Sequence, residues 1–182
     1  MRIFLDTEFT GLHQHTSLIS IGLAADNGDI FYAERNDFDK AQLDDWVNDN
    51  VLPHLSGDLP AVASLIPSSE MVGCGNASEV EKALRLWLER FGEKNSVEIW
   101  ADVLAWDWVL LCNLMGGAFG LPEQIHYIPR DLSTLMVIRG IDPDTPREEL
   151  GKVAWSHPKL KLTKHHALYD ALLEKDIFEK IY

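Results

Sequence analysis

The chain has 182 residues and lacks the features that would mark it as a disulfide-linked, membrane or exported protein. Its only cysteines are Cys74 and Cys112, too few for a disulfide framework or a cysteine-based zinc site. No apolar run approaches the roughly eighteen residues of a membrane-spanning helix. Met1 and Arg2 lead directly into an apolar segment, which leaves no room for a signal peptide. We therefore expect a cytoplasmic protein with reduced thiols and no membrane association.

Basic residues are also scarce, because 16 Lys and Arg stand against 29 Asp and Glu and give a net charge of −13. Proteins that bind nucleic acid are usually basic, since phosphate contacts dominate their affinity. The charge is unevenly spread: residues 130–165 hold seven basic and five acidic residues, so this stretch is +2 and the remainder −15. Such a stretch either guides a strand of nucleic acid or forms a solvated loop. The acidic remainder fits an enzyme that holds a few nucleotides through metal ions.

What the chain does contain is a core and a regular order of elements. Apolar residues make up 46%, enough for one α/β domain over residues 1–182. The patterns predict strands at 3–5, 18–25, 29–34, 97–101 and 127–128, helices at 41–51, 78–91, 104–115 and 167–181, and a long loop at 53–76. Ser78 and Glu81 form a capping-box pattern, and Asp131 or Ser133 is expected to cap a later segment. This order predicts a mixed central sheet flanked by helices.

Two acids lie close together at the end of the first predicted strand. Asp6 and Glu8 are two residues apart, so their side chains are expected on the same face of the strand. Two carboxylates held in this way repel each other unless a cation lies between them. Mg²⁺ or Mn²⁺ would relieve the repulsion, because both prefer carboxylate oxygens. The alternative is an exposed strand end with two solvated acids.

His165 and Asp170 precede and begin the last predicted helix. On one helix they would diverge by about 140°, since each residue turns about 100°. They can converge only if His165 lies in the loop before the helix, where it could act as a general base near neutral pH. The alternative is a surface histidine beside a helix acid. Asp107, in the first turns of an apolar helix, would be a costly buried charge without a metal ion or an ion pair.

Three segments together resemble the motifs of the DEDD 3′–5′ exonucleases of the ribonuclease H-like superfamily. Residues 6–12 (DTEFTGL) are similar to the first motif, and Trp-Asp at 106–107 followed by a leucine is similar to the second. Residues 165–171 (HHALYDA) resemble the third motif of the histidine-containing branch. Their order and spacing, with the small size of the chain, are closest to the compact exoribonucleases. The chain departs from the second motif at Asp102 and Val103, where a small polar residue is often found.

The resemblance implies a ribonuclease H-like fold and a metal-dependent active site. Asp6, Glu8, Asp107 and Asp170 would hold two Mg²⁺ or Mn²⁺ ions per active site. His165 would take a proton from the water that attacks the terminal phosphodiester. The product would be a nucleoside 5′-monophosphate.

The resemblance also implies how the strand would be held. Main-chain groups around Phe9 and Thr10 would hold the terminal sugar, and Leu12 would wedge against the last base. The Phe9 side chain would either pack beside that base or belong to the hydrophobic core. Apart from the resemblance, the charge pattern predicts that Lys159, Lys161 and Lys164 guide the strand to the metal ions, with a solvated basic loop as the alternative. The expected substrate is single-stranded RNA or a 3′ overhang. Single-stranded DNA is the alternative substrate, and a catalytically idle nucleotide-binding module is the alternative class. Related small enzymes often pair, so a homodimer is expected.

Overall fold

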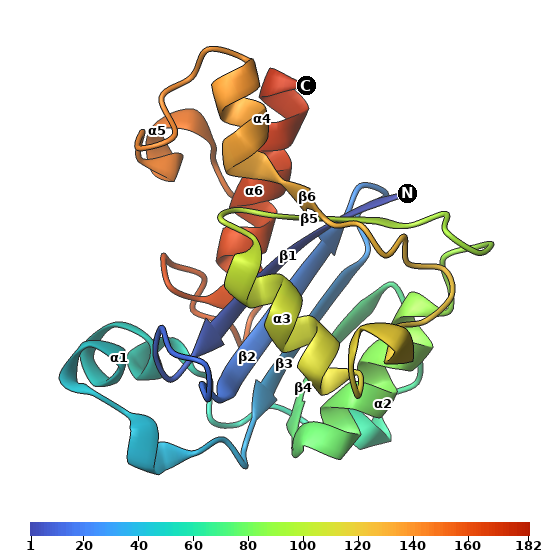
Figure 1. Cartoon of the computed structure of the whole chain (residues 1–182). Helices are drawn as coiled ribbons and strands as arrows, with labels where there is room; N and C mark the ends of the chain where they lie inside the picture. The colour runs from blue at the N-terminus through green and yellow to red at the C-terminus, as the bar shows by residue number, and fades with distance from the viewer.

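A six-stranded mixed sheet lies at the centre of the computed structural model, which describes all 182 residues (Figure 1). The strands are β1 (Arg2–Phe9), β2 (Leu18–Ala25), β3 (Ile30–Arg35), β4 (Glu70–Gly75), β5 (Glu98–Ala101) and β6 (Arg130–Asp131). Their spatial order is β4-β3-β2-β1-β5-β6. β2 is antiparallel to β1 and β3, and the remaining neighbours are parallel. The predicted α/β architecture is confirmed, and it is consistent with a ribonuclease H-like fold.

Helices cover both faces of this sheet (Figure 1). They are α1 (Asp45–Asn50), α2 (Ala77–Leu88), α3 (Ala105–Leu114), α4 (Leu132–Ile138), α5 (Arg147–Leu150) and α6 (Ala167–Ile181). α2 and α3 share the largest buried cluster with one face of the sheet. α6 lies on the other face against β1 and β2, and α4 and α5 pack against α6. None of the helices combines the length and apolar character needed to cross a membrane.

The alternation of side chains along β1 decides which face carries the acids. Ile3 and Leu5 belong to the cluster with α2 and α3, whereas Phe4 packs with α6. Because successive side chains point to opposite faces of a strand, Asp6 and Glu8 continue the Phe4 face. β1 is longer than predicted and runs to Phe9, so both acids lie within the strand rather than after it.

A glycine on β2 allows the first turn of α6 to approach these acids. Gly22 pairs with Asp6 in the β1–β2 register. A Cβ atom at Gly22 would lie 2.4 Å from backbone atoms of Ala167 and Leu168. Only glycine therefore lets the start of α6 rest on the sheet beside Asp6.

The prediction of a continuous loop at 53–76 was wrong at its end, where residues 70–75 form β4. The glycines that favoured a loop have a different purpose. A Cβ at Gly73 would meet Val62 at 2.9 Å, and one at Gly75 would meet Val62 at 3.1 Å. Glycine in this strand therefore allows the preceding segment to pack closely against it.

Two predicted helix boundaries also differ. The helix predicted at 41–51 is a 3₁₀ turn at Lys40–Gln42 followed by α1, because the Asp44 side chain accepts from the Val47 N–H and begins the helix there. α2 begins at Ala77 with a capping box formed by Asn76 and Glu79, two residues before the predicted pair. The earlier cap is preferred because both reciprocal hydrogen bonds form there.

The short strand predicted at 127–128 was wrong, because pairing at this edge occurs on either side of it. Ile125 forms an isolated bridge with Val97, and β6 follows at 130–131. The expected cap is present: the Asp131 side chain accepts from the Thr134 N–H at the start of α4.

Candidate active site

One cavity of about 580 Å³ brings together residues from β1, α1, α3 and the start of α6. All five residues proposed from the sequence as catalytic line it, namely Asp6, Glu8, Asp107, His165 and Asp170. They come from segments up to 164 residues apart. The fold thus places the four carboxylates and the histidine around a single space.

Asp107 is fixed by the residue that lies between the two acids of β1. Its Oδ1 atom accepts hydrogen bonds from the Thr7 N–H at 2.9 Å and from the Thr7 hydroxyl at 2.6 Å. Thr7 is buried, and so is Asp107, at 7% exposure. These two bonds attach the first turn of α3 to β1 and set the third carboxylate beside the first two.

His165 and Asp170 converge because the histidine precedes the helix. α6 begins at Ala167, and His165 adopts a left-handed backbone with φ 63°. Its N–H donates to Asp170 Oδ2 at 2.9 Å. One ligand atom each of Glu8, His165 and Asp170 lie within 4.8 Å of one another. The carboxylate oxygens are ligands that suit Mg²⁺ and Mn²⁺, and the imidazole nitrogen lies beside them, within reach of a water molecule bound to such an ion.

The four carboxylates have raised pKa values. Burial is the largest cause for each, and the pKa rises to about 8 for Glu8 and to about 7 for Asp107 and Asp170. The pKa of Asp6 is raised by burial and then by the charges of Asp107, Asp170 and Glu8. None of the four forms a salt bridge within the chain. Buried acids without a basic partner fit a site for divalent cations, whose binding would favour the ionised forms.

The histidine of the site is held neutral and oriented. Burial, followed by the charge of Lys164, lowers the pKa of His165. Its ring meets the Trp46 ring edge-on, with centroids 5.1 Å apart and planes at 76°. A neutral imidazole in a fixed orientation can accept a proton.

The residues proposed for substrate contact divide into two groups. Phe9 and Leu12 line the cavity, and Leu12 is 75% exposed. Thr10 does not line it: Thr10 is buried, its N–H donates to the Ser17 carbonyl and its hydroxyl to Gln42.

Lys164 also lies outside the main cavity. It lines an adjoining space of about 210 Å³ that shares Asp6, His165 and Asp170 with the site. Its Nζ is 3.6 Å from Glu148, and its side chain is 60% exposed. Lys164 therefore stands at the rim of the site rather than within it.

Sequence reasoning missed the contribution of α1, and it noted the turn before α3 only as a departure from the second motif. Trp46 and Val47 on α1 line the cavity, as does Val103. Val47 and Val51 pack on Ile19 of β2 and so hold α1 beside the site. No sequence motif marks Trp46 or Val47, because their proximity to His165 arises only in the folded chain.

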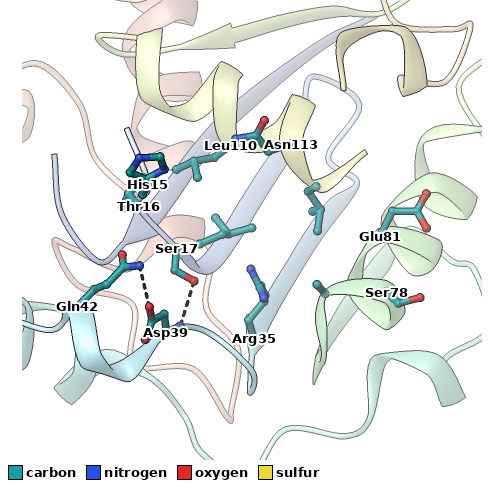
Figure 2. Close-up of a pocket in the computed structure, with 13 residues that line it drawn as sticks. His15, Thr16, Ser17, Arg35, Asp39, Gln42, Ser78, Glu81, Leu110 and Asn113 are labelled. Carbon is teal, nitrogen blue, oxygen red and sulfur yellow. Dashed lines mark hydrogen bonds between the residues drawn. The ribbon is translucent and has the colours of Figure 1, made fainter. Parts of the chain in front are cut away.

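A second cavity, of about 470 Å³, lies between α2 and α3 (Figure 2). It contains none of the five residues described above. Three of its polar residues bond to one another: the Gln42 amide donates to Asp39 at 2.8 Å, and the Asp39 N–H donates to the Ser17 hydroxyl at 3.1 Å (Figure 2). The acidic cavity is therefore the stronger candidate for chemistry.

Comparison with known proteins agrees with this geometry. Residues 1–182 match the model of a family described as the 3′-5′ exoribonuclease Rv2179c-like domain. Two curated proteins of Mycobacterium tuberculosis are similar: the 3′-5′ exoribonuclease Rv2179c of strain ATCC 25618 / H37Rv and the 3′-5′ exoribonuclease MT2234.1 of strain CDC 1551 / Oshkosh. Each is 35% identical over 147 residues, which cover 81% of this chain and 80% of the relative. The chain thus belongs to the 3′-5′ exoribonuclease Rv2179c-like family.

Proposed function

We propose that the protein is a divalent-metal-dependent 3′–5′ exoribonuclease, and that residues 1–182 form a single exonuclease domain. The observation that carries the proposal is the convergence of four uncompensated carboxylates and one histidine on one cavity. Family membership supports the reaction class and the RNA substrate. A single domain is supported by the sheet, whose strands run from residue 2 to residue 131, and by α6, which packs on β1 and β2.

The metal ligands in this proposal are Asp6, Glu8, Asp107 and Asp170, which would hold two Mg²⁺ or Mn²⁺ ions per active site. Bound divalent ions would supply Lewis-acid stabilisation of the phosphodiester and a lower pKa for the attacking water. The raised pKa values of the carboxylates are consistent with the assignment, because several buried acids are costly to ionise together and bound divalent cations would lower that cost.

His165 is the proposed general base. Its lowered pKa leaves a ring nitrogen free at neutral pH to take a proton from the attacking water. The water oxygen then bonds to the terminal phosphorus, and the bond to the preceding 3′ oxygen breaks. That oxygen takes up a proton as the new 3′ hydroxyl, and the released product is a nucleoside 5′-monophosphate.

The terminal nucleotide is proposed to occupy the apolar part of the cavity. Phe9 lies with its ring 6.1 Å from that of Trp106, and both line the cavity with the exposed Leu12. Leu12 is placed to wedge against the last base, and Lys164 at the rim is placed to guide the strand. The Thr10 N–H is already bonded to the Ser17 carbonyl, so the proposed main-chain contact to the sugar comes from other groups around Phe9 and Thr10.

Two further proposals concern the protein in the cell. A cytoplasmic location is supported by Cys74 and Cys112, which are both free thiols. A homodimer is the proposed oligomeric state, and sedimentation at micromolar concentration tests it.

Digestion of end-labelled RNA and DNA of the same sequence tests the function. With Mg²⁺ or Mn²⁺ we expect a ladder that shortens from the 3′ end of the RNA and releases nucleoside 5′-monophosphates, and no cleavage in chelator. Faster digestion of the DNA would instead indicate a deoxyribonuclease. Strand binding without cleavage in either metal would indicate a nucleotide-binding module.

Substitutions in the same assay test the assigned roles. Asp6→Ala and Asp170→Ala should abolish turnover, and His165→Ala should lower it by about two decades or more, the scale for losing a general base. The control is Glu179→Ala, which removes a half-exposed acid from the same helix outside the cavity and should leave turnover unchanged. Equal residual activity in wild type and Asp6→Ala would exclude the proposed site.

A further inference from the structure

Val103, in the turn between β5 and α3, has a backbone conformation that its side chain disfavours. Its φ is 50°, in the left-handed region. Of the three non-glycine residues with positive φ, the other two are Asn95 and His165. Asparagine and histidine are enriched in that region, whereas a β-branched residue there is an outlier. Its presence therefore needs an explanation.

Core packing does not explain it. The side chain of Val103 is 64% exposed and belongs to none of the buried hydrophobic clusters. It lines the catalytic cavity together with Trp106 and Asp107, which follow it on α3. The exposed surface of Val103 therefore faces the space that the substrate is proposed to occupy.

Contacts on both sides fix the turn in this conformation. Before it, the Asp102 N–H donates to Glu174 Oε1 at 3.0 Å, and the Asp102 carboxylate accepts from Arg147 Nε at 2.6 Å and Nη2 at 3.0 Å. After it, the Leu104 N–H donates to Asp131 Oδ2 at 3.2 Å. Strained backbone persists where surrounding structure determines it in this way, and such sites cluster at ligand contacts.

The chemistry of valine limits what it can contact. Its side chain carries no charge and no hydrogen-bonding group, so that side chain offers nothing to a phosphate oxygen beyond exclusion of water. It can pack against a base or the carbon face of a ribose. Val103 is also one of the two positions at which the chain departs from the second motif, where a small polar residue is often found.

We propose that Val103 is a substrate-binding residue that packs against a base or ribose of the bound strand, and that the turn is held in its disfavoured conformation to present this side chain. The proposal rests on the exonuclease function proposed above. It assigns Val103 to substrate binding and not to the chemical step.

Two valine-to-alanine substitutions, one in the turn and one on α3, test the proposed contact between Val103 and the bound strand. Val103→Ala should raise the KM for a short RNA about tenfold with kcat within about twofold, because apolar contact area is lost while the metal ligands stay in place. The matched control is Val109→Ala, the same chemical change at a 49% exposed position on α3 outside the cavity. It should leave both constants unchanged. Equal KM values for wild type and Val103→Ala would overturn the proposal.

Val103→Gly and Val103→Asn separate the backbone from the side chain. Both residues accept positive φ, so the melting temperature should stay within about 1 °C of wild type or rise. The KM of Val103→Gly should nevertheless rise as in Val103→Ala, because glycine does not restore the aliphatic contact. A melting temperature lower by about 5 °C or more would show a structural role and overturn the proposal. Inactive wild-type protein would overturn the exonuclease function and this inference together, whereas active wild type with unchanged variants would overturn only the inference.

Discussion

His165 depends on its neighbours for both its position and its protonation. Its N–H donates to Asp170, and its ring lies edge-on to Trp46. The backbone at φ 63° turns the residue back from the start of α6 toward the cavity. Because burial and Lys164 lower its pKa, the ring is neutral at physiological pH. Orientation and charge state are thus set by separate contacts, which can be tested separately.

Trp46 is expected to position the base. Trp46→Ala should lower kcat for RNA about tenfold, because the His165 ring loses the contact that limits its rotation, while Trp46→Phe should retain most of the rate. Steady-state kinetics on a short RNA measure both. Tyr127→Ala, which removes an aromatic residue that is 71% exposed and outside the cavity, is the control. A rise in KM with unchanged kcat would assign Trp46 to substrate binding alone.

At the residue scale, the sequence predicts which residues carry the reactive groups better than it predicts which residues contact them in the folded chain. Asp6 and Glu8 could be identified because a two-residue spacing on a strand is a local property. Trp46 could not, since it lies on a six-residue helix far from His165 in sequence. Val103 could be noted as a departure from the second motif, but its left-handed backbone conformation appears only in the structure. Thr10 was expected to contact substrate, but hydrogen bonds that no motif reveals hold it outside the cavity.

At the scale of elements, the approach of α6 to β2 sets the site. Gly22→Ala would place a methyl group 2.4 Å from the backbone of Ala167 and Leu168. We expect a loss of about 1–3 kcal/mol in the free energy of unfolding, as for an overpacked core. Turnover by the Gly22→Ala variant should fall by a larger factor than the fraction of folded protein does. The reason is that His165 and Asp170 would be displaced together with the start of α6. Thermal melts and kinetics on the same preparation measure the two effects.

Gly140→Ala is the control for Gly22→Ala. Gly140 has a φ of 75°, and a Cβ atom there would have nothing within 4 Å, so alanine adds backbone strain without displacing an element. It should lower stability by about 1–2 kcal/mol and leave kcat unchanged. If Gly22→Ala also kept wild-type kcat, the approach of α6 to β2 would not control the site.

Helices and strands with a regular spacing of apolar residues could be predicted from the sequence. Elements that depend on contacts with distant segments could not. The bounds of β2 match the predicted strand at 18–25, and α6 matches the predicted terminal helix. β4 was hidden by Gly73 and Gly75, whose function is to admit Val62. β6 has only two residues, too few to show an alternating pattern in the sequence, and it exists as a strand because it pairs with β5.

At the scale of the whole molecule, the acidic site links stability to pH. The pKa values of Glu8, Asp107 and Asp170 are raised to about 7 or 8 from ordinary values near 4. Between those limits the folded, metal-free protein binds more protons than the unfolded chain, so its stability falls as pH rises. The pKa of buried His166, lowered to about 4 from 6.5, acts in the opposite direction below pH 6.5. The net fall should therefore be clearest between about pH 6.5 and pH 8.

Thermal melts in chelator and in Mn²⁺ test this linkage. In chelator the melting temperature should fall by about 3 °C or more between pH 6.5 and pH 8. Mn²⁺ should raise it more at pH 8 than at pH 6.5, since cations bind the ionised carboxylates of the folded state. Asp170→Asn should weaken both effects. A chelated protein that becomes more stable across this window would contradict the account of the carboxylates.

The central claim is that these carboxylates form one binding site for divalent cations. Calorimetric titration of Mn²⁺ into the chelator-stripped protein at pH 7.5 tests it most directly, with Asp6→Asn and Glu179→Ala titrated beside the wild type. The account predicts two ions per wild-type chain, the same for Glu179→Ala, and binding weakened at least tenfold in Asp6→Asn. Equal Mn²⁺ binding by the wild type and Asp6→Asn would contradict it.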